Sequence, residues 1–121
     1  MAHVLVVDDD DIVLKALVSV LRRLGHDVSG TSSARAALEH VQTKRPDLLV
    51  VDYRLPEMDG VTLYREVLKA LGDDAPPVVF VSGSPIEEVA ANVPSTCRAT
   101  FVQKPFEFRD LAREVGALLA A

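Results

Sequence analysis

Short apolar runs alternate along the chain with longer stretches in which apolar residues recur every three or four positions. The runs cover residues 4–7, 48–51, 78–81 and 99–103, with a weaker candidate at residues 27–31. A continuous apolar run of this length is typical of a strand that is covered on both faces, as in a parallel sheet. Helical periodicity marks residues 12–24, 33–44, 60–71, 86–93 and 108–119. The alternation predicts an α/β fold of the (βα)5 type, with a doubly wound, five-stranded parallel sheet.

Residues with strong capping preferences mark the ends of several predicted helices. Leu24 is expected on the apolar face of the first helix, and Gly25 is expected to close that helix. Asp59 is the expected N-cap of the third helix. Ser84 and Pro85 are expected to be the N-cap and the first-turn proline of the fourth. In the last helix, the predicted apolar face comprises Phe108, Leu111, Ala112, Val115, Leu118 and Leu119.

The length of 121 residues predicts one domain. The last predicted helix ends where the sequence ends, so we expect a single domain over residues 1–121 with no output domain. The lone cysteine, Cys97, is not expected to take part in an intramolecular disulfide. We find neither a signal-peptide pattern nor an apolar run near the ~18 residues of a membrane span. A cytoplasmic protein that does not contact membranes is therefore expected.

Negative charge is concentrated at one point of the sequence. The formal net charge is −5, and four consecutive aspartates occupy residues 8–11. Because nucleic-acid-binding proteins present a basic surface, direct binding of nucleic acid is not expected. The acidic run instead favours a cation or a basic partner nearby. Acids are also common at helix N-termini, and Asp10 and Asp11 are expected to serve mainly as acids of the first helical turn.

Chemically active side chains directly follow four of the apolar runs. Asp8 and Asp9 follow the run at residues 4–7, and Asp52 follows the run at 48–51. Ser82 follows the run at 78–81, and Lys104 follows the run at 99–103. The carboxyl ends of parallel strands meet at one edge of the sheet, where open α/β sheets bind their ligands. Clustered carboxylates need a cation, and oxygen ligands suit Mg²⁺. With Lys104 as a second positive charge, the set suits phosphoryl transfer to a carboxylate nucleophile.

Four motifs, in this order and at these separations, resemble the receiver domain of two-component response regulators, of the chemotaxis-regulator type. They are Val-Val-Asp-Asp at residues 6–9, Asp-Tyr-Arg-Leu-Pro-Glu-Met-Asp-Gly at 52–60, Val-Ser-Gly at 81–83 and Lys-Pro-Phe at 104–106. The resemblance covers essentially the full chain and implies a flavodoxin-like fold with the strand order 2-1-3-4-5. It implies a phosphorelay protein that is not an enzyme, apart from catalysing its own phosphorylation and dephosphorylation.

The resemblance also implies which residues handle the phosphoryl group. Asp52 is the expected phosphoacceptor, and Lys104 is expected to contact the phosphoryl group. The peptide bond between Lys104 and Pro105 is expected to be cis. Arg54 and Ser84 flank the site and are expected to affect the lifetime of the phosphorylated state.

A magnesium site is implied beside the phosphoacceptor. Asp9 and Asp52 are expected to bind Mg²⁺ directly, together with the backbone carbonyl of Arg54. Asp8 is expected to act through a metal-bound water molecule.

The resemblance further implies how the protein switches and which partners it binds. Ser82 is the expected hydroxyl that moves toward the phosphoryl group, and Phe101 is the aromatic residue expected to follow it. The expected phosphodonor is a sensor histidine kinase or a histidine phosphotransfer protein. The state of the switch is expected to control a downstream protein partner or output domain through helix four, strand five and helix five. The resemblance also allows a homodimer through that face.

Two other functions are compatible with parts of the sequence. A Mg²⁺-dependent phosphohydrolase of the haloacid dehalogenase type uses an Asp-x-Asp nucleophile motif, which Asp8 and Asp10 could mimic alongside Ser82 and Lys104. Such an enzyme also needs an acidic pair after the lysine, which this sequence lacks. A receiver-like interaction module that is never phosphorylated is the other alternative. The phosphohydrolase and the receiver differ in their nucleophile, which is Asp8 in the first and Asp52 in the second.

Overall fold

Five parallel strands form the centre of the molecule in the computed structural model, which describes residues 2–94 and 98–120. They are β1 (His3–Val7), β2 (Asp27–Thr31), β3 (Leu48–Asp52), β4 (Val78–Ser82) and β5 (Ala99–Gln103). The strand order is β2-β1-β3-β4-β5, and every neighbouring pair is parallel. The predicted (βα)5 architecture and the order 2-1-3-4-5 are therefore confirmed, and the strand bounds agree with the sequence to within one residue.

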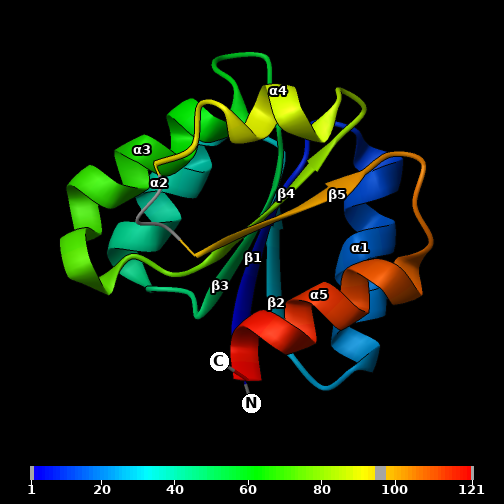
Figure 1. Cartoon of the computed structure of the whole chain (residues 1–121). Helices are drawn as coiled ribbons and strands as arrows, with labels where there is room; N and C mark the ends of the chain where they lie inside the picture. Colours follow the sequence, from blue (N-terminus) through cyan, green and yellow to red (C-terminus); the bar gives the residue numbers. More distant parts are fainter. Residues whose placement is uncertain (1, 95–97, 121) are drawn as a thin grey trace.

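Helices cover both faces of the sheet (Figure 1). They are α1 (Asp11–Arg23), α2 (Ala34–Thr43), α3 (Gly60–Leu71), α4 (Ile86–Ala90) and α5 (Phe108–Ala120), with a short 3-10 helix, η1 (Gly72–Asp74), after α3. Helices α1 and α5 contact each other on one face, and α2 and α3 contact each other on the opposite face. No helix within the described residues is long and apolar enough to cross a membrane.

Two apolar clusters, one on each face of the sheet, hold the layers together. In β1, Leu5 and Val7 point into the cluster under α2, α3 and α4, whereas Val4 and Val6 point into the cluster under α1 and α5. All four side chains are at most 1% exposed. Because successive side chains of a strand face opposite sides, a strand with both sides covered must be apolar throughout. This requirement explains the unbroken apolar runs in the sequence.

Gly25 closes helix α1 as the sequence predicts, but the helix ends at Arg23, one residue earlier than expected. Gly25 has a φ of +93°, and its N–H donates to the carbonyl of Arg22. The N–H of His26 donates to the carbonyl of Leu21, which completes a Schellman motif. Leu24 was expected on the apolar face, but that prediction is wrong because Leu24 caps the helix and its side chain is 52% exposed.

The fourth helix differs most from its prediction. It begins at Ile86 after Pro85, which occupies the N-cap position without a side-chain cap bond, so the prediction of Ser84 as the N-cap is wrong. It ends at Ala90, short of the predicted end at Val93. In α5, Phe108 is 39% exposed, while Leu111 and Val115 are fully buried as expected. Cys97 lies outside the described residues.

Candidate functional site

The acidic run after β1 divides into residues with different surroundings. Asp8 is buried, and its Oδ1 accepts a hydrogen bond of 2.9 Å from the backbone N–H of Asp10. Asp9 is exposed. Asp10 is the N-cap of α1, where its Oδ1 accepts from the N–H of Ile12, and Asp11 is the first residue of the helix. Asp10 and Asp11 therefore serve the helix N-terminus, as the sequence analysis expected.

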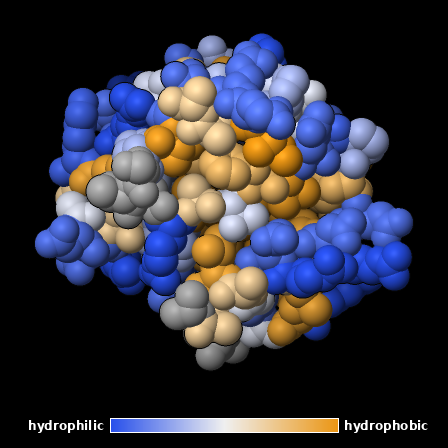
Figure 2. Space-filling model, in the orientation of Figure 1, coloured by the Kyte–Doolittle hydropathy of each residue, from blue (hydrophilic) through white to orange (hydrophobic). Residues whose placement is uncertain are grey.

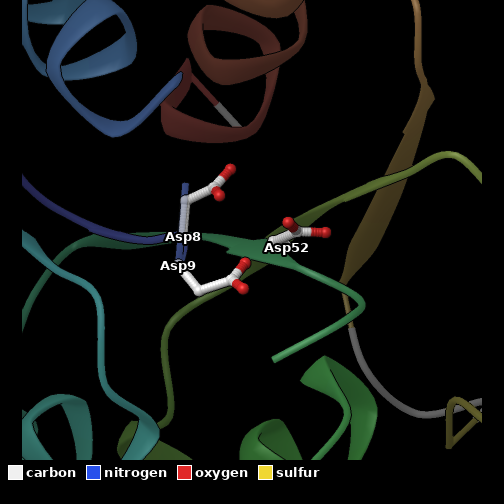
Figure 3. A group of neighbouring side chains, drawn as sticks. All are labelled: Asp8, Asp9 and Asp52. Carbon is white, nitrogen blue, oxygen red and sulfur yellow. The ribbon is translucent and has the colours of Figure 1, made fainter. Parts of the chain in front are cut away.

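Three carboxylates meet at the carboxyl edge of the sheet. Asp8 and Asp9 follow β1, and Asp52 is the last residue of the adjacent strand β3 (Figure 3). One carboxylate oxygen of each residue lies within 4.8 Å of the other two. Asp52 is only 7% exposed, and its Oδ1 accepts from the N–H of Arg54. The fold thus brings Asp52 next to two adjacent carboxylates that lie far from it in the sequence.

Lys104 provides the positive charge next to this cluster. Its Nζ lies 3.2 Å from Asp52 Oδ2 and 3.9 Å from Asp8 Oδ2. Its backbone N–H donates to the carbonyl of Ser82, and its peptide bond to Pro105 is cis, as expected. These contacts hold the start of the β5–α5 loop over the ends of β3 and β4. One ammonium group is thus placed against two of the three carboxylates.

The charge on Asp8 is poorly compensated. Burial raises the pKa of its carboxyl group to about 6, and the nearby negative charge of Asp52 adds to that increase. The hydrogen bond from Asp10 and the charge of Lys104 act in the opposite direction. None of the described residues donates a hydrogen bond to the buried Asp8 Oδ2, although the ammonium of Lys104 lies within ion-pair distance. A buried acceptor without a donor is costly, so this edge of the sheet is suited to a further cation.

A chain of polar contacts crosses the site on the β4 side. The backbone N–H of Ser84 donates to Ser82 Oγ at 2.9 Å, and the guanidinium of Arg54 donates to Ser84 Oγ at 3.1 Å. Both serines are buried. The Arg54 side chain therefore links the loop after β3 to the loop after β4. The sequence did not predict this contact.

Gly60 allows the loop after β3 to pack tightly against the site. Its N–H donates to the carbonyl of Tyr53 at 2.6 Å. A Cβ atom at position 60 would lie 2.6 Å from the backbone oxygen of Asp52 and 2.9 Å from the side chain of Val51. No larger residue fits here without moving the backbone at Asp52. The Asp-Gly pair at residues 59–60 is the sequence signal for this role: Asp59 caps α3 as predicted, whereas the close packing of Gly60 was not predicted.

Phe101 extends the site toward the outer strand β5. It pairs with Phe80 across β4 and β5, and the two rings stack with their centroids 5.8 Å apart and an interplanar angle of 20°. Phe101 is half-buried against the apolar cluster under α2, α3 and α4. The ring is therefore packed in its present position while retaining access to the surface.

The structure places the residues predicted for the phosphoryl and metal sites near one edge of the sheet, whereas the predicted switch residue Phe101 lies within β5. The residues come from the ends of β1, β3, β4 and β5 and from the loops that follow them; they are Asp8, Asp9, Asp52, Arg54, Ser82, Ser84, Lys104 and Pro105. Oxygen donors beside a fixed ammonium suit a divalent cation and a phosphoryl group.

Comparison with known proteins gives a consistent result. Residues 4–116 match the family model described as the response regulator receiver domain. The response regulator protein TodT of Pseudomonas putida is 36% identical over 116 residues, which is 96% of this chain and 49% of TodT. Sensor kinase CckA of Brucella abortus is 37% identical over 120 residues, which is 98% of this chain and 12% of CckA. The chain spans about half the length of TodT and a smaller share of CckA.

A solved structure shares the whole fold. The crystal structure of a putative response regulator from Chloroflexus aurantiacus has a TM-score of 0.87 and 31% sequence identity, and the match covers 99% of this chain and 98% of that one. The similarity thus extends over the sheet, all five helices and the edge that carries the carboxylates.

Proposed function

Because the chain belongs to the response regulator receiver domain family, a family of two-component signalling, we propose that Asp52 is its phosphoacceptor. The observation that supports this assignment is the position of Asp52 at the end of β3, within 3.2 Å of Lys104 and among the carboxylates. A buried carboxylate held beside a fixed ammonium group can accept a phosphoryl group without a large rearrangement. The family assignment does not favour the phosphohydrolase or the never-phosphorylated module.

The donor is a phosphohistidine on a sensor kinase or on a phosphotransfer protein. A carboxylate oxygen of Asp52 forms a bond to phosphorus while the bond between phosphorus and the imidazole nitrogen breaks. The leaving nitrogen keeps the electron pair of that bond, and the product is an acyl phosphate. Lys104 neutralises charge on the phosphoryl oxygens, since its Nζ already faces the Asp52 carboxylate. The protein thus promotes only its own phosphorylation and dephosphorylation.

The residues present also fit Mg²⁺. Asp9, Asp52 and the backbone carbonyl of Arg54 would hold the ion, with Asp8 acting through a coordinated water molecule. The unpaired oxygen of Asp8 and the three converging carboxylates support this assignment. When bound, Mg²⁺ supplies positive charge that stabilises the phosphoryl oxygens during transfer.

The switch is assigned to Ser82 and Phe101. The hydroxyl oxygen of Ser82 now accepts from the N–H of Ser84, and Ser82 ends the strand next to that of Asp52, so its hydroxyl proton is proposed to be donated to a phosphoryl oxygen there. Phe101 is half-buried, so an inward shift changes the surface of β5. Figure 2 shows apolar side chains gathered over β4 and β5, between α4 and α5. This face is the proposed contact surface for a downstream protein or an output domain, or for a second copy.

Arg54 and Ser84 are proposed to set the lifetime of the phosphorylated state. Their mutual hydrogen bond lies beside Asp52, so it affects how water approaches a phosphoryl group there. We place the protein in the cytoplasm, where a kinase would supply its phosphoryl group.

Intact-mass measurement tests the assignment of Asp52. The protein is incubated with acetyl phosphate, with Mg²⁺ or with a chelator, alongside Asp52→Asn and the matched control Asp11→Asn. One added phosphate is expected on the wild type and on Asp11→Asn in the presence of Mg²⁺, and none on Asp52→Asn. An added phosphate that survives Asp52→Asn overturns the proposal.

A further inference from the structure

Strand β2 is the outermost strand of the sheet, and within residues 2–94 and 98–120 no other strand pairs with its outer edge. Its backbone groups divide by position. The N–H of Asp27 donates to Ala2, and the carbonyl of Thr31 accepts from Asp8, so these two residues face β1. Backbone groups of a strand alternate in direction, so Val28 and Gly30 direct their N–H and C=O groups to the free edge. This edge can accept another strand.

A side chain already occupies one of these edge positions. The guanidinium of Arg22, in the last turn of α1, donates to the carbonyl of Val28 at 2.9 Å. The contact confirms the outward direction of that carbonyl. It also shows that a donor can reach this edge from solvent, because Arg22 is exposed.

A groove runs beside this edge. It has a volume of about 590 Å³ and lies between α1 and β2, with Leu14 and Val18 as its apolar floor. Gly30 lies at its side, where an added Cβ atom would come within 2.9 Å of Val18 and 3.0 Å of Leu14. Leu14 and Val18 therefore fill the space that a side chain at position 30 would take, and they form the apolar surface next to the outward backbone groups of β2.

Basic side chains surround the groove. Lys15, Arg22 and Arg23 line it, and all three are exposed. None of its lining residues is acidic, although the chain as a whole carries a net charge of −5. A surface that reverses the sign of the whole chain attracts acidic ligands and repels basic ones.

We propose that the α1–β2 groove binds an extended acidic segment of a partner protein, which adds a strand to the free edge of β2. Backbone hydrogen bonds to Val28 and Gly30 provide the pairing, and alternate apolar side chains of the segment pack on Leu14 and Val18. Acidic side chains of the segment pair with the basic rim. The guanidinium of Arg22 then exchanges the Val28 carbonyl for a carboxylate of the segment. This binding does not depend on phosphorylation of Asp52.

Peptide selection followed by amide NMR tests this proposal. A displayed library of random decapeptides is panned against the intact chain, and the enriched peptides are synthesised and titrated into ¹⁵N-labelled protein. We expect enrichment of sequences that alternate apolar and acidic residues, with the largest shifts at the amides of Val28 and Gly30. Methylation of alternate backbone nitrogens of such a peptide should abolish binding, because strand pairing needs those N–H groups.

Charge-reversal variants supply the control. Arg23→Glu and Lys15→Glu should weaken binding by at least about fivefold each, since like charges repel at the rim. Arg35→Glu, an exposed arginine on α2, should bind as the wild type does, and so should Asp52→Asn. The proposal is overturned if no acidic sequences are enriched, if the shifts map away from β2, or if the N-methylated peptide still binds.

Discussion

Lys104 Nζ lies 3.2 Å from Asp52 Oδ2, so the ammonium group and the carboxylate touch across 52 positions of sequence. The same nitrogen lies 3.9 Å from Asp8 Oδ2. Lys104 therefore lies between the proposed phosphoacceptor and Asp8 and contacts both carboxylates. It also competes with any divalent cation for the same carboxylate oxygens.

Replacing Lys104 by methionine should separate metal binding from phosphoryl transfer. Without the ammonium group, Mg²⁺ should bind several-fold more tightly, because a competing positive charge is gone. The rate of phosphorylation should fall about a hundredfold, the usual loss when one group that stabilises the transition state is removed. Calorimetric titration and timed intact-mass spectra measure the two quantities. Lys69→Met, on the exposed side of α3, is the matched control, and equal phosphorylation rates in the two variants would refute the role of Lys104.

The pH dependence of stability without Mg²⁺ should reveal the burial of Asp8. The pKa of Asp8 is raised from 3.8 to about 6, so the folded state favours the protonated carboxyl group. The free energy of unfolding contributed by this residue therefore falls as pH rises between these two values, by at most about 3 kcal/mol. Urea unfolding should show Asp8→Asn becoming more stable than the wild type over this range. Saturating Mg²⁺ should reduce the difference, and parallel curves for the two proteins in its absence would contradict the account.

A histidine pair at the opposite end of β1 should produce the reverse dependence. His3 and His40 face each other with their Nε2 atoms 3.0 Å apart. Burial lowers the pKa of His40, and the nearby positive charges of His3 and Lys44 add to this effect, partly opposed by Asp27. A lowered pKa means that the folded state binds fewer protons, so stability is lost as pH falls below 6.5.

Substitution of His40 isolates this contribution. The loss of stability on acidification should be smaller in His40→Asn than in the wild type, when both are followed by urea unfolding. His26→Asn serves as the control because His26 is not part of the pair. A wild-type pH profile in the His40 variant would refute the contribution of that residue.

Gly60 should tolerate no side chain. Gly60→Ala should destabilise the fold by about 2 kcal/mol, because the new Cβ atom overlaps the backbone oxygen of Asp52. It should also slow phosphorylation, since Asp52 must move. Gly116→Ala is the control: position 116 is open, and a helical alanine there should stabilise by up to about 1 kcal/mol. Chemical unfolding compares the two, and equal stabilities would contradict the tight packing at Gly60.

The sequence predicts the strands well because strands buried on both faces must be apolar, and residues 48–51 and 78–81 carry nothing else. The strand order follows from the family resemblance, since apolar runs alone do not determine which strands are neighbours. The errors lie at helix ends. Ser84 was expected to cap α4, but its hydroxyl binds Arg54, a tertiary partner that capping preference does not take into account. The 52% exposure of Leu24 has a local origin instead, because α1 ends one residue earlier than predicted and Leu24 is its C-cap.

The residues of the candidate site could also be predicted, whereas their contacts could not. Strand ends place Asp8, Asp52 and Lys104 at one edge, but the unpaired Asp8 Oδ2 depends on side-chain packing. The contacts between Arg54 and Ser84 and between His3 and His40 join residues 30 and 37 positions apart. No local pattern marks such pairs.

Chemical trapping of the phosphorylated residue tests the central claim most directly. Borohydride reduces an acyl phosphate to an alcohol, so a phosphorylated aspartate becomes homoserine and can be located by peptide mass spectrometry. After incubation with acetyl phosphate and Mg²⁺, our account predicts homoserine at position 52 alone and none in Asp52→Asn. Homoserine at position 8, the nucleophile of the phosphohydrolase alternative, or a phosphate that resists reduction, would contradict it.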